Sequence, residues 1–180
     1  MAAPRVVETA RLVLSEPQAS DAAEIFARYA GDADVTRYLS WPRHRSIADT
    51  EGFLAFSASE WARWSSGPYV IRSRAAGRLL GSTGLSFETA TRAMTGYVLA
   101  KDAWGHGFAT EALRAMVDTA RAMSVTQLFA LCHPAHRASW HVLEKCGFVR
   151  DPTWTETAAF PNLAPGVQQA VLCYTLNPQS

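Results

Sequence analysis

The sequence predicts an α/β domain with a mixed sheet. Segments with the patterns of strands and helices follow one another in the order β-α-α-β-β-β-α-β-α-β-β, which is typical of a sheet covered by helices. The clearest helical periodicity in the chain begins at Phe108, directly after three β-rich segments. The length of 180 residues suits one domain, residues 1–180, that buries a sizeable core.

The N-terminal third predicts one strand followed by two helices. The strand is Arg11–Pro17, a β-rich run closed by proline. A first helix is expected to run through about Ala30, opened by Asp21 or Ser20, because either side chain can accept hydrogen bonds from free backbone N–H groups. A second helix is expected over Ile47–Trp64, opened by Ser46 or Asp49.

Three β-rich segments with short turns between them fill the middle of the chain. They are Pro68–Arg74, Arg78–Phe87 and Met94–Ala100. After them the chain alternates between helix and strand, and each helix shows apolar residues three and four positions apart. The segments expected there are a helix over Phe108–Met123, a strand over Thr126–Cys132, a helix over His136–Cys146 that stops at Gly147, and strands near Phe148–Thr155 and Gln168–Leu176.

Composition and charge limit the classes of function. Seventeen Lys and Arg residues against 16 Asp and Glu residues give a net charge of +1, so we expect no nucleic-acid partner. Cys132, Cys146 and Cys173 are odd in number and far apart, which indicates a reducing compartment rather than a disulfide framework. The first residues lack the apolar core of a signal peptide and the chain lacks a long apolar run, so we expect a cytoplasmic protein without a membrane span.

The stretch AWGHGFATEA, from Ala103 to Ala112, carries the most informative motif. It joins a predicted strand to a predicted helix, where unpaired backbone N–H groups and the positive end of the helix dipole favour an anion. Gly105 and Gly107 remove side chains that would keep a phosphate away, and Thr110 can add a hydroxyl donor. The motif predicts a pyrophosphate site, with a plain glycine-rich turn as the alternative.

Two nucleotide motifs do not fit this stretch. A dinucleotide fingerprint needs a third glycine where Thr110 stands, and it follows an early strand. A P-loop needs the run G-x-x-x-x-G-K-[ST], which the chain lacks. A dinucleotide oxidoreductase is therefore a remote alternative.

The stretch resembles the acyl-CoA loop of the GNAT superfamily of N-acetyltransferases. The family pattern is Gln/Arg-x-x-Gly-x-Gly/Ala, and W-G-x-G-[YF]-A-T-E-A is similar to the Rim-type branch, the ribosomal-protein N-terminal acetyltransferases and their relatives. Three further segments match that branch in the same order: ETARLVLSEP near the start, GYVL at Gly96–Leu99, and HPAHRASWHVLEKCGF at His133–Phe148. The resemblance covers about residues 9–177.

The resemblance implies a mostly antiparallel sheet, flanked by helices, that splays between its fourth and fifth strands. Acetyl-CoA would enter this gap as the co-substrate, and backbone groups of Val98 and Leu99 would pair with its pantetheine arm. His136, where the family usually has asparagine, would contact the same arm. The loop residues that would hold the pyrophosphate are Trp104, Gly105, His106, Gly107, Phe108, Ala109 and Thr110.

Acetyl transfer to an amine needs an acid for the departing thiolate and a route for the amine proton. Ser139 occupies the family's serine position and is the candidate acid, while the tyrosine that many members carry four residues later is Leu143 here. The glutamate of many Rim-type enzymes is Thr95 here, so Glu88, at the end of the preceding strand, is the candidate base through water. The alternatives are a helix serine bonded to its own backbone and a solvated turn carboxylate.

A zinc site is the competing interpretation of the Cys and His residues between 132 and 146. His136 and His141 are five residues apart on a predicted helix, so they point to different faces, and we expect no metal. Aromatic residues of the N-terminal helical region would mostly pack in the core, although one or two would line the acceptor pocket. The Arg43-His44-Arg45 run could attract an acidic acceptor, with a solvated loop as the favoured alternative.

The sequence therefore predicts an acetyl-CoA-dependent N-acetyltransferase that acts on a primary amine by direct attack. The acceptor is a protein or peptide N-terminus or a small-molecule amine. The alternative from another class is an acyl-CoA-binding module that has lost catalysis, since Thr95 and His136 depart from the family pattern. A homodimer stays open, because dimers are common among the relatives.

Overall fold

Ten strands are present in residues 2–180, the part of the chain that the computed structural model describes. They are β1 (Val6–Glu8), β2 (Leu12–Ser15), β3 (Pro68–Ser73), β4 (Leu79–Thr89), β5 (Arg92–Leu99), β6 (Gln127–Cys132), β7 (Val149–Arg150), β8 (Thr157–Ala159), β9 (Gln168–Ala170) and β10 (Leu172–Leu176). Eight of them form one sheet in the order β1-β2-β3-β4-β5-β6-β10-β7, and β8 pairs with β9 separately. Every pair in the main sheet is antiparallel except β5 with β6, which confirms the predicted mixed, mostly antiparallel sheet.

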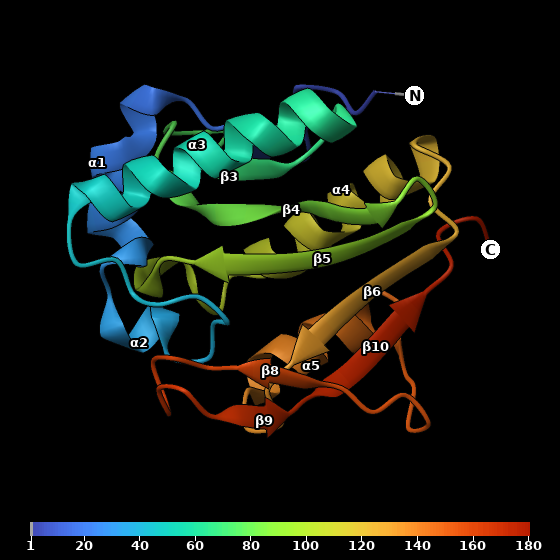
Figure 1. The fold of residues 1–180 in the computed structure, drawn as a ribbon. Coiled ribbons are helices and arrows are strands. Elements are labelled where there is room, and N and C mark those ends of the chain that lie inside the picture. The colour runs from blue at the N-terminus through green and yellow to red at the C-terminus, as the bar shows by residue number, and fades with distance from the viewer. Residues whose placement is uncertain (1) are drawn as a thin grey trace.

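Helices cover both faces of the main sheet (Figure 1). The α-helices are α1 (Ala22–Ile25), α2 (Ala33–Thr36), α3 (Ile47–Trp64), α4 (Phe108–Ala122) and α5 (Arg137–Lys145). Helices α1 and α3 lie on one face, and α4 and α5 lie on the opposite face (Figure 1). No helix within residues 2–180 combines the length and the apolar composition that a membrane crossing requires.

The two long helices form where the sequence predicts them. Helix α3 begins with a capping box in which Ser46 and Asp49 satisfy each other's backbone N–H groups, so both predicted capping residues are used. Helix α4 begins after Gly107 and buries its apolar stripe against β4 and β5, with Leu113 and Met116 fully buried. Full burial of each such side chain stabilises the fold by about 1.5–3 kcal/mol.

Several short elements differ from the prediction. The first helix is made of three pieces, because a 3-10 turn (Ala19–Asp21) precedes α1 and a π-helical turn (Phe26–Ala30) follows it. The strand expected over Phe148–Thr155 ends at Arg150, where the Asp151 carboxylate accepts hydrogen bonds from the next backbone N–H groups and turns the chain. The strand expected at the C-terminus is divided into β9 and β10, and β1, α2 and β8 were not predicted.

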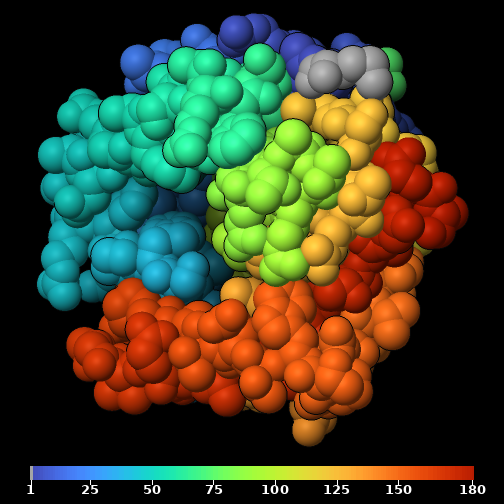
Figure 2. All heavy atoms as spheres, turned by 45° about the vertical axis from the view of Figure 1, so that its right-hand side comes forward, coloured from blue at the N-terminus to red at the C-terminus, as the bar shows by residue number. Residues whose placement is uncertain are grey.

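The pairing of β5 with β6 is short. It joins Arg92 with Gln127, Ala93 with Leu128 and Met94 with Phe129, and the two strands then separate. The implied splay between the fourth and fifth predicted strands is therefore confirmed. On the surface, a recess opens between α3, in teal, and the green β4–β5 hairpin (Figure 2).

Candidate active site

A cleft of about 620 Å³ lies between α3 and the sheet and reaches into the gap between β5 and β6. Its floor is Ser82–Ser86 of β4 and Met94–Val98 of β5, and Ala130–Cys132 of β6 lie across the gap. The ends of β6 and α5 add His133, His136 and Ser139. The gap and the cleft are therefore one continuous space.

Backbone groups of β5 face this space beyond Met94. Ala100 N–H donates to Leu80 O of β4 at 2.7 Å, and backbone direction alternates along an antiparallel strand. The backbone of Val98 therefore faces β4, while those of Tyr97 and Leu99 face the gap. The expectation that the Val98 backbone pairs with the pantetheine arm is therefore corrected, and Leu99 remains the candidate for that contact. Its N–H is the group available, because the Leu99 carbonyl already accepts from Trp104 Nε1 at 2.9 Å.

The glycine loop before α4 has the geometry of an anion cradle. Gly105 and Gly107 have φ of +77° and +78°, the left-handed region that costs other L-residues roughly 1–2 kcal/mol. A Cβ at Gly105 would meet nothing within 4 Å, and one at Gly107 would meet only Arg11 Nη2 at 3.5 Å. The first amides of α4 are thus reachable from solvent, which suits a pyrophosphate.

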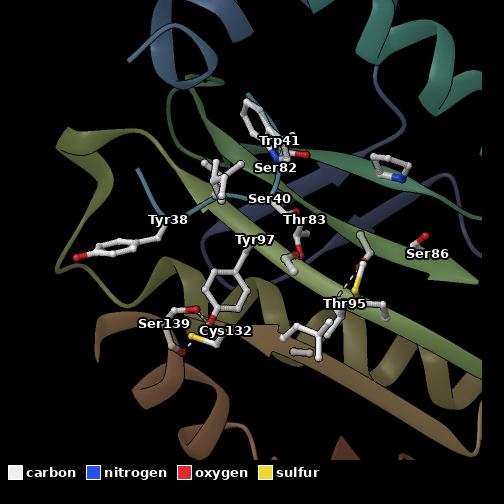
Figure 3. Close-up of a pocket in the computed structure, with 18 of the residues that line it drawn as sticks. Tyr38, Ser40, Trp41, Ser82, Thr83, Ser86, Thr95, Tyr97, Cys132 and Ser139 are labelled. Carbon is white, nitrogen blue, oxygen red and sulfur yellow. Dashed lines mark hydrogen bonds between the residues drawn. The ribbon is translucent and has the colours of Figure 1, made fainter. Parts of the chain in front are cut away.

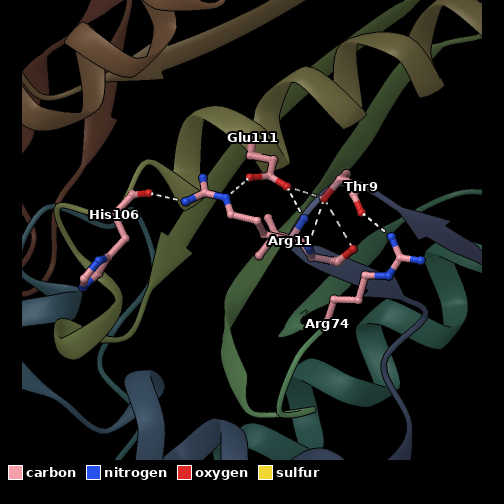
Figure 4. Close-up of polar contacts among 6 residues, drawn as sticks. Thr9, Arg11, Arg74, His106 and Glu111 are labelled. Atoms are coloured by element: carbon pink, nitrogen blue, oxygen red, sulfur yellow. Dashed lines mark hydrogen bonds and ion pairs between the residues drawn. The ribbon is translucent and has the colours of Figure 1, made fainter.

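An ion-paired network holds this loop from the N-terminal side (Figure 4). Arg11 Nε donates to Glu111 Oε2 at 2.7 Å, and Arg11 Nη1 donates to His106 O at 2.8 Å. Thr9 Oγ1 and Arg11 N donate to Glu111 Oε1 at 2.6 and 2.8 Å. Burial alone would raise the pKa of Glu111, but the hydrogen bonds from Thr9 and Arg11 lower it. The sequence carries no local signal for this network, because its members lie about a hundred positions apart.

Ser139 meets Tyr97 at the gap (Figure 3). The Tyr97 hydroxyl donates to Ser139 O at 2.7 Å and lies 3.1 Å from Ser139 Oγ. Burial raises the pKa of Tyr97, so its hydroxyl keeps its proton. Tyr97 thus brings a phenol beside Ser139, whereas Leu143, at the family's tyrosine position, is buried in the core. Tyr97 is the tyrosine of the GYVL segment, and its presence there is the one sequence signal for this contact.

His136 lines the cleft as a half-buried imidazole. Its ring stacks on Tyr38, with centroids 4.8 Å apart and an interplanar angle of 21°. Burial, with a smaller contribution from the charge of His133, lowers the pKa of His136. The imidazole is therefore neutral at neutral pH and can make one donor or acceptor contact with a bound arm.

Glu88 is not brought into the cleft. It lies at the exposed end of β4, beyond Ser86, and Arg92 Nε donates to its carboxylate at 2.6 Å. Thr95 does not replace the missing glutamate either, since its hydroxyl donates to Gly84 O at 2.9 Å. Two acidic residues of α3, Asp49 and Glu60, are among the residues that line the cleft, and the sequence did not point to either as a site residue.

The Cys and His residues of the C-terminal half do not gather around one point. Cys132 lines the gap and Cys146 packs against α4, while His141 is exposed. Within residues 2–180, no group of three His, Cys, Asp or Glu side chains is placed to hold a metal ion.

Comparison with known proteins decides the family. A family model described as an acetyltransferase (GNAT) domain matches residues 11–149. The chain belongs to the GNAT acetyltransferases. The uncharacterized N-acetyltransferase YoaA of Bacillus subtilis is 28% identical over 149 residues, which are 81% of this chain and 84% of that one.

Two solved structures show the same fold. A GNAT-family acetyltransferase from Bacillus anthracis has a TM-score of 0.81 at 18% identity, covering 97% of this chain and 99% of that chain. RimL, the ribosomal L7/L12 α-N-protein acetyltransferase in complex with coenzyme A, has a TM-score of 0.81 at 17% identity, covering 97% and 98%. As a GNAT acetyltransferase, the chain takes acetyl-CoA as its co-substrate, and the bare loop and the unpaired part of β5 fit its pyrophosphate and pantetheine.

Proposed function

We propose that this protein transfers the acetyl group of acetyl-CoA to a primary amine bound in the cleft between α3 and the sheet. The observation that carries the proposal is that the gap between β5 and β6 opens directly into that cleft. An acyl donor entering through the gap and an amine entering from the α3 side would therefore meet beside Ser139 and Tyr97. The amine belongs to a protein or peptide N-terminus or to a small molecule.

Each residue near the gap has one task in this proposal. Acetyl-CoA supplies an activated acyl carbon when it is bound. The Leu99 N–H faces the gap and stabilises negative charge on the acyl oxygen during attack. Ser139 Oγ donates its proton to the departing sulfur, and the Tyr97 hydroxyl, which donates to Ser139 O at 2.7 Å, holds that serine in place.

The overall step balances without another reactant. The amine reaches the cleft as an ammonium ion and attacks after losing one proton to solvent. The C–N bond forms and the C–S bond breaks, and the electron pair of the broken bond leaves on sulfur. Sulfur is protonated through Ser139, which recovers a proton from the amide nitrogen as that nitrogen loses its second proton. The products are an amide, the CoA thiol and one released proton.

The test is CoA release measured with a thiol reagent across a panel of primary amines. We expect Ser139→Ala to lower kcat by about 100-fold, the low end for loss of a general acid, with the KM for acetyl-CoA within twofold of wild type. Tyr97→Phe should lower kcat by a smaller factor, since it removes only the support of Ser139. Ser59→Ala, at an exposed serine of α3 away from the cleft, is the matched control.

Two results would count against the proposal. If Ser139→Ala lowers kcat no more than Ser59→Ala does, Ser139 is not the acid. If the wild-type protein binds CoA tightly but turns over no amine in the panel, the protein is an acyl-CoA-binding module. A binding module is the specific alternative, because Thr95 and His136 stand where the family usually has glutamate and asparagine.

A further inference from the structure

The acceptor side of the cleft carries negative charge without a fixed positive charge. Asp49 and Glu60 are among the residues that line it, and within residues 2–180 no Lys or Arg residue is. His44 and His136 line it too, and burial lowers the pKa of both imidazoles, so neither adds a full charge at neutral pH. The neighbouring arginines of the Arg43-His44-Arg45 run are exposed and stay outside the wall. An acidic acceptor would therefore find no fixed positive charge here.

One face of α3 supplies both carboxylates. Asp49, Phe53, Phe56 and Glu60 follow one another at helical spacing and all line the cleft. Asp49 is committed to the start of the helix, because it accepts from Arg45 N at 2.7 Å and from Ser46 N at 3.1 Å. Two phenyl rings therefore separate a carboxylate that caps the helix from one nearer its end.

Glu60 is the uncommitted carboxylate. In the described part of the chain its side chain has no hydrogen-bond or ion-pair partner at all, although it is half-buried. The basic residue nearest along the helix, Arg63, lies over the ring of Trp64 instead, at 5.0 Å from its centroid. A half-buried carboxylate beside aromatic rings attracts a cation most strongly when that cation is itself removed from water.

The position of Glu60 separates it from the reacting end of the cleft. A Cβ at Gly67 would lie 3.3 Å from Glu60 Cβ, so Glu60 stands over the start of β3. Pro68 of β3 pairs with Gly84 of β4, and Gly84 pairs with Gly96 of β5, which lies at the edge of the gap. Adjacent strands are about 4.8 Å apart, so two spacings place Pro68, at the start of the strand beneath Glu60, roughly 10 Å from the gap along the sheet.

The floor is open at its gap end. A Cβ at Gly96 of β5 would meet nothing within 4 Å, whereas one at Gly84, its partner on β4, would meet Gly67 O at 2.8 Å. Phe53 and Phe56 stand opposite this floor on α3. The space suits an apolar spacer between a reacting nitrogen at the gap and a second group at Glu60.

We propose that the acceptor is an amine with a second positively charged group on an apolar spacer, and that Glu60 binds that second group. The inference rests on the proposed acetyl transfer. Glu60 selects the acceptor and takes no part in the bond changes. Amines that carry a carboxylate at the same distance are poor substrates, because their carboxylate would face that of Glu60.

Three amines of one chain length test this inference. Hexylamine, hexamethylenediamine and ε-aminocaproate each have six carbons and share five methylenes, and they differ at the sixth carbon, which is a methyl group, a methylene that carries an ammonium group, or a carboxylate. We expect kcat/KM to fall in the order diamine, monoamine, amino acid, with at least about tenfold between the first and the last. The difference should appear in KM more than in kcat.

Glu60→Gln separates a specificity role from a structural one. It keeps the shape of the side chain and removes the charge, so we expect kcat/KM for the diamine to fall about tenfold while that for hexylamine stays within twofold. Glu51→Gln, at an exposed position of the same helix outside the cleft, should change neither value. The melting temperature of each variant checks that the fold is intact.

The outcomes distinguish this inference from the function on which it rests. Turnover of hexylamine and the diamine with equal kcat/KM overturns the role of Glu60 and leaves acetyl transfer standing. An equal loss for all three amines in Glu60→Gln also overturns it, since a structural role would give that result. Turnover of other primary amines in the panel but of none of these three overturns this inference alone, whereas CoA binding with turnover of no amine in the panel overturns both.

Discussion

Replacing Arg11 with alanine tests whether the network around the glycine loop serves co-substrate binding. The side chain makes an ion pair with Glu111, a hydrogen bond to His106 O, and a contact with the Phe108 ring at 4.7 Å from its centroid. The Arg11 side chain is 50% exposed, which places the ion pair at about 0.2–1 kcal/mol. The hydrogen bond adds about 0.5–1.5 kcal/mol and the ring contact about 0.5–1 kcal/mol.

The sum of these contributions is about 1–3.5 kcal/mol, so Arg11→Ala should lower the melting temperature by roughly 4–8 °C for a loss near 2 kcal/mol. Because the freed loop no longer presents its amides in one arrangement, the KM for acetyl-CoA should rise about tenfold, with kcat at saturation within twofold. Calorimetry and initial-rate kinetics on the same preparations measure both effects.

Arg74→Ala is the matched control for this variant. Arg74 also bonds the N-terminal segment, through Thr9 O at 3.2 Å and Glu8 at 3.3 Å, but it does not touch the loop. It should lower the melting temperature less and leave the KM for acetyl-CoA unchanged. The reasoning is refuted if Arg11→Ala lowers the melting temperature while its KM equals that of Arg74→Ala.

Two further predictions concern the loop and the cleft. Gly107→Ala should weaken CoA binding in calorimetric titration, because a left-handed φ costs alanine roughly 1–2 kcal/mol. Gly77→Ala places the same strain at φ +64° in a remote turn and should leave the affinity for CoA unchanged. Equal affinities of the two variants for CoA would contradict the assignment of the loop to CoA binding. Burial lowers the pKa of His136 in the folded protein below its ordinary value of 6.5, so the unfolded chain binds more protons at pH values between the two pKa values, and stability is lost as the pH falls below about 6.5. Urea unfolding at pH 7 and pH 5 should show a smaller loss in His136→Asn than in wild type, and a loss no smaller than in the exposed-site variant His141→Asn would contradict the role of His136.

The sequence predicts the long elements and the bare loop well, because their signals are local. Ser46 and Asp49 lie at the start of the helix that they cap, and Gly105 and Gly107 are of the residue type that most readily adopts a left-handed φ. The splayed sheet followed from family resemblance and is confirmed. The backbone direction of Val98 could not be predicted, because it depends on the register with β4 and a shift of one residue reverses it.

The polar contacts of the site were beyond the sequence for a different reason. Glu111 meets Arg11, and Tyr97 meets Ser139, across separations of 100 and 42 residues, and no local pattern encodes such meetings. Glu88 illustrates the converse: its place at a strand end suggested the cleft, but its side chain turns to Arg92 four residues on. Tertiary packing decides which carboxylate meets the cleft.

The early end of the β5–β6 pairing makes the main sheet two half-sheets joined at one end. A pantetheine arm lying in the gap would bridge the two half-sheets. A ligand that binds only the folded state raises the free energy of unfolding by about 4 kcal/mol when its concentration is about 1,000 times the Kd. The resistance of this protein to proteolysis would then rise with the concentration of CoA and acetyl-CoA, which carry the same arm.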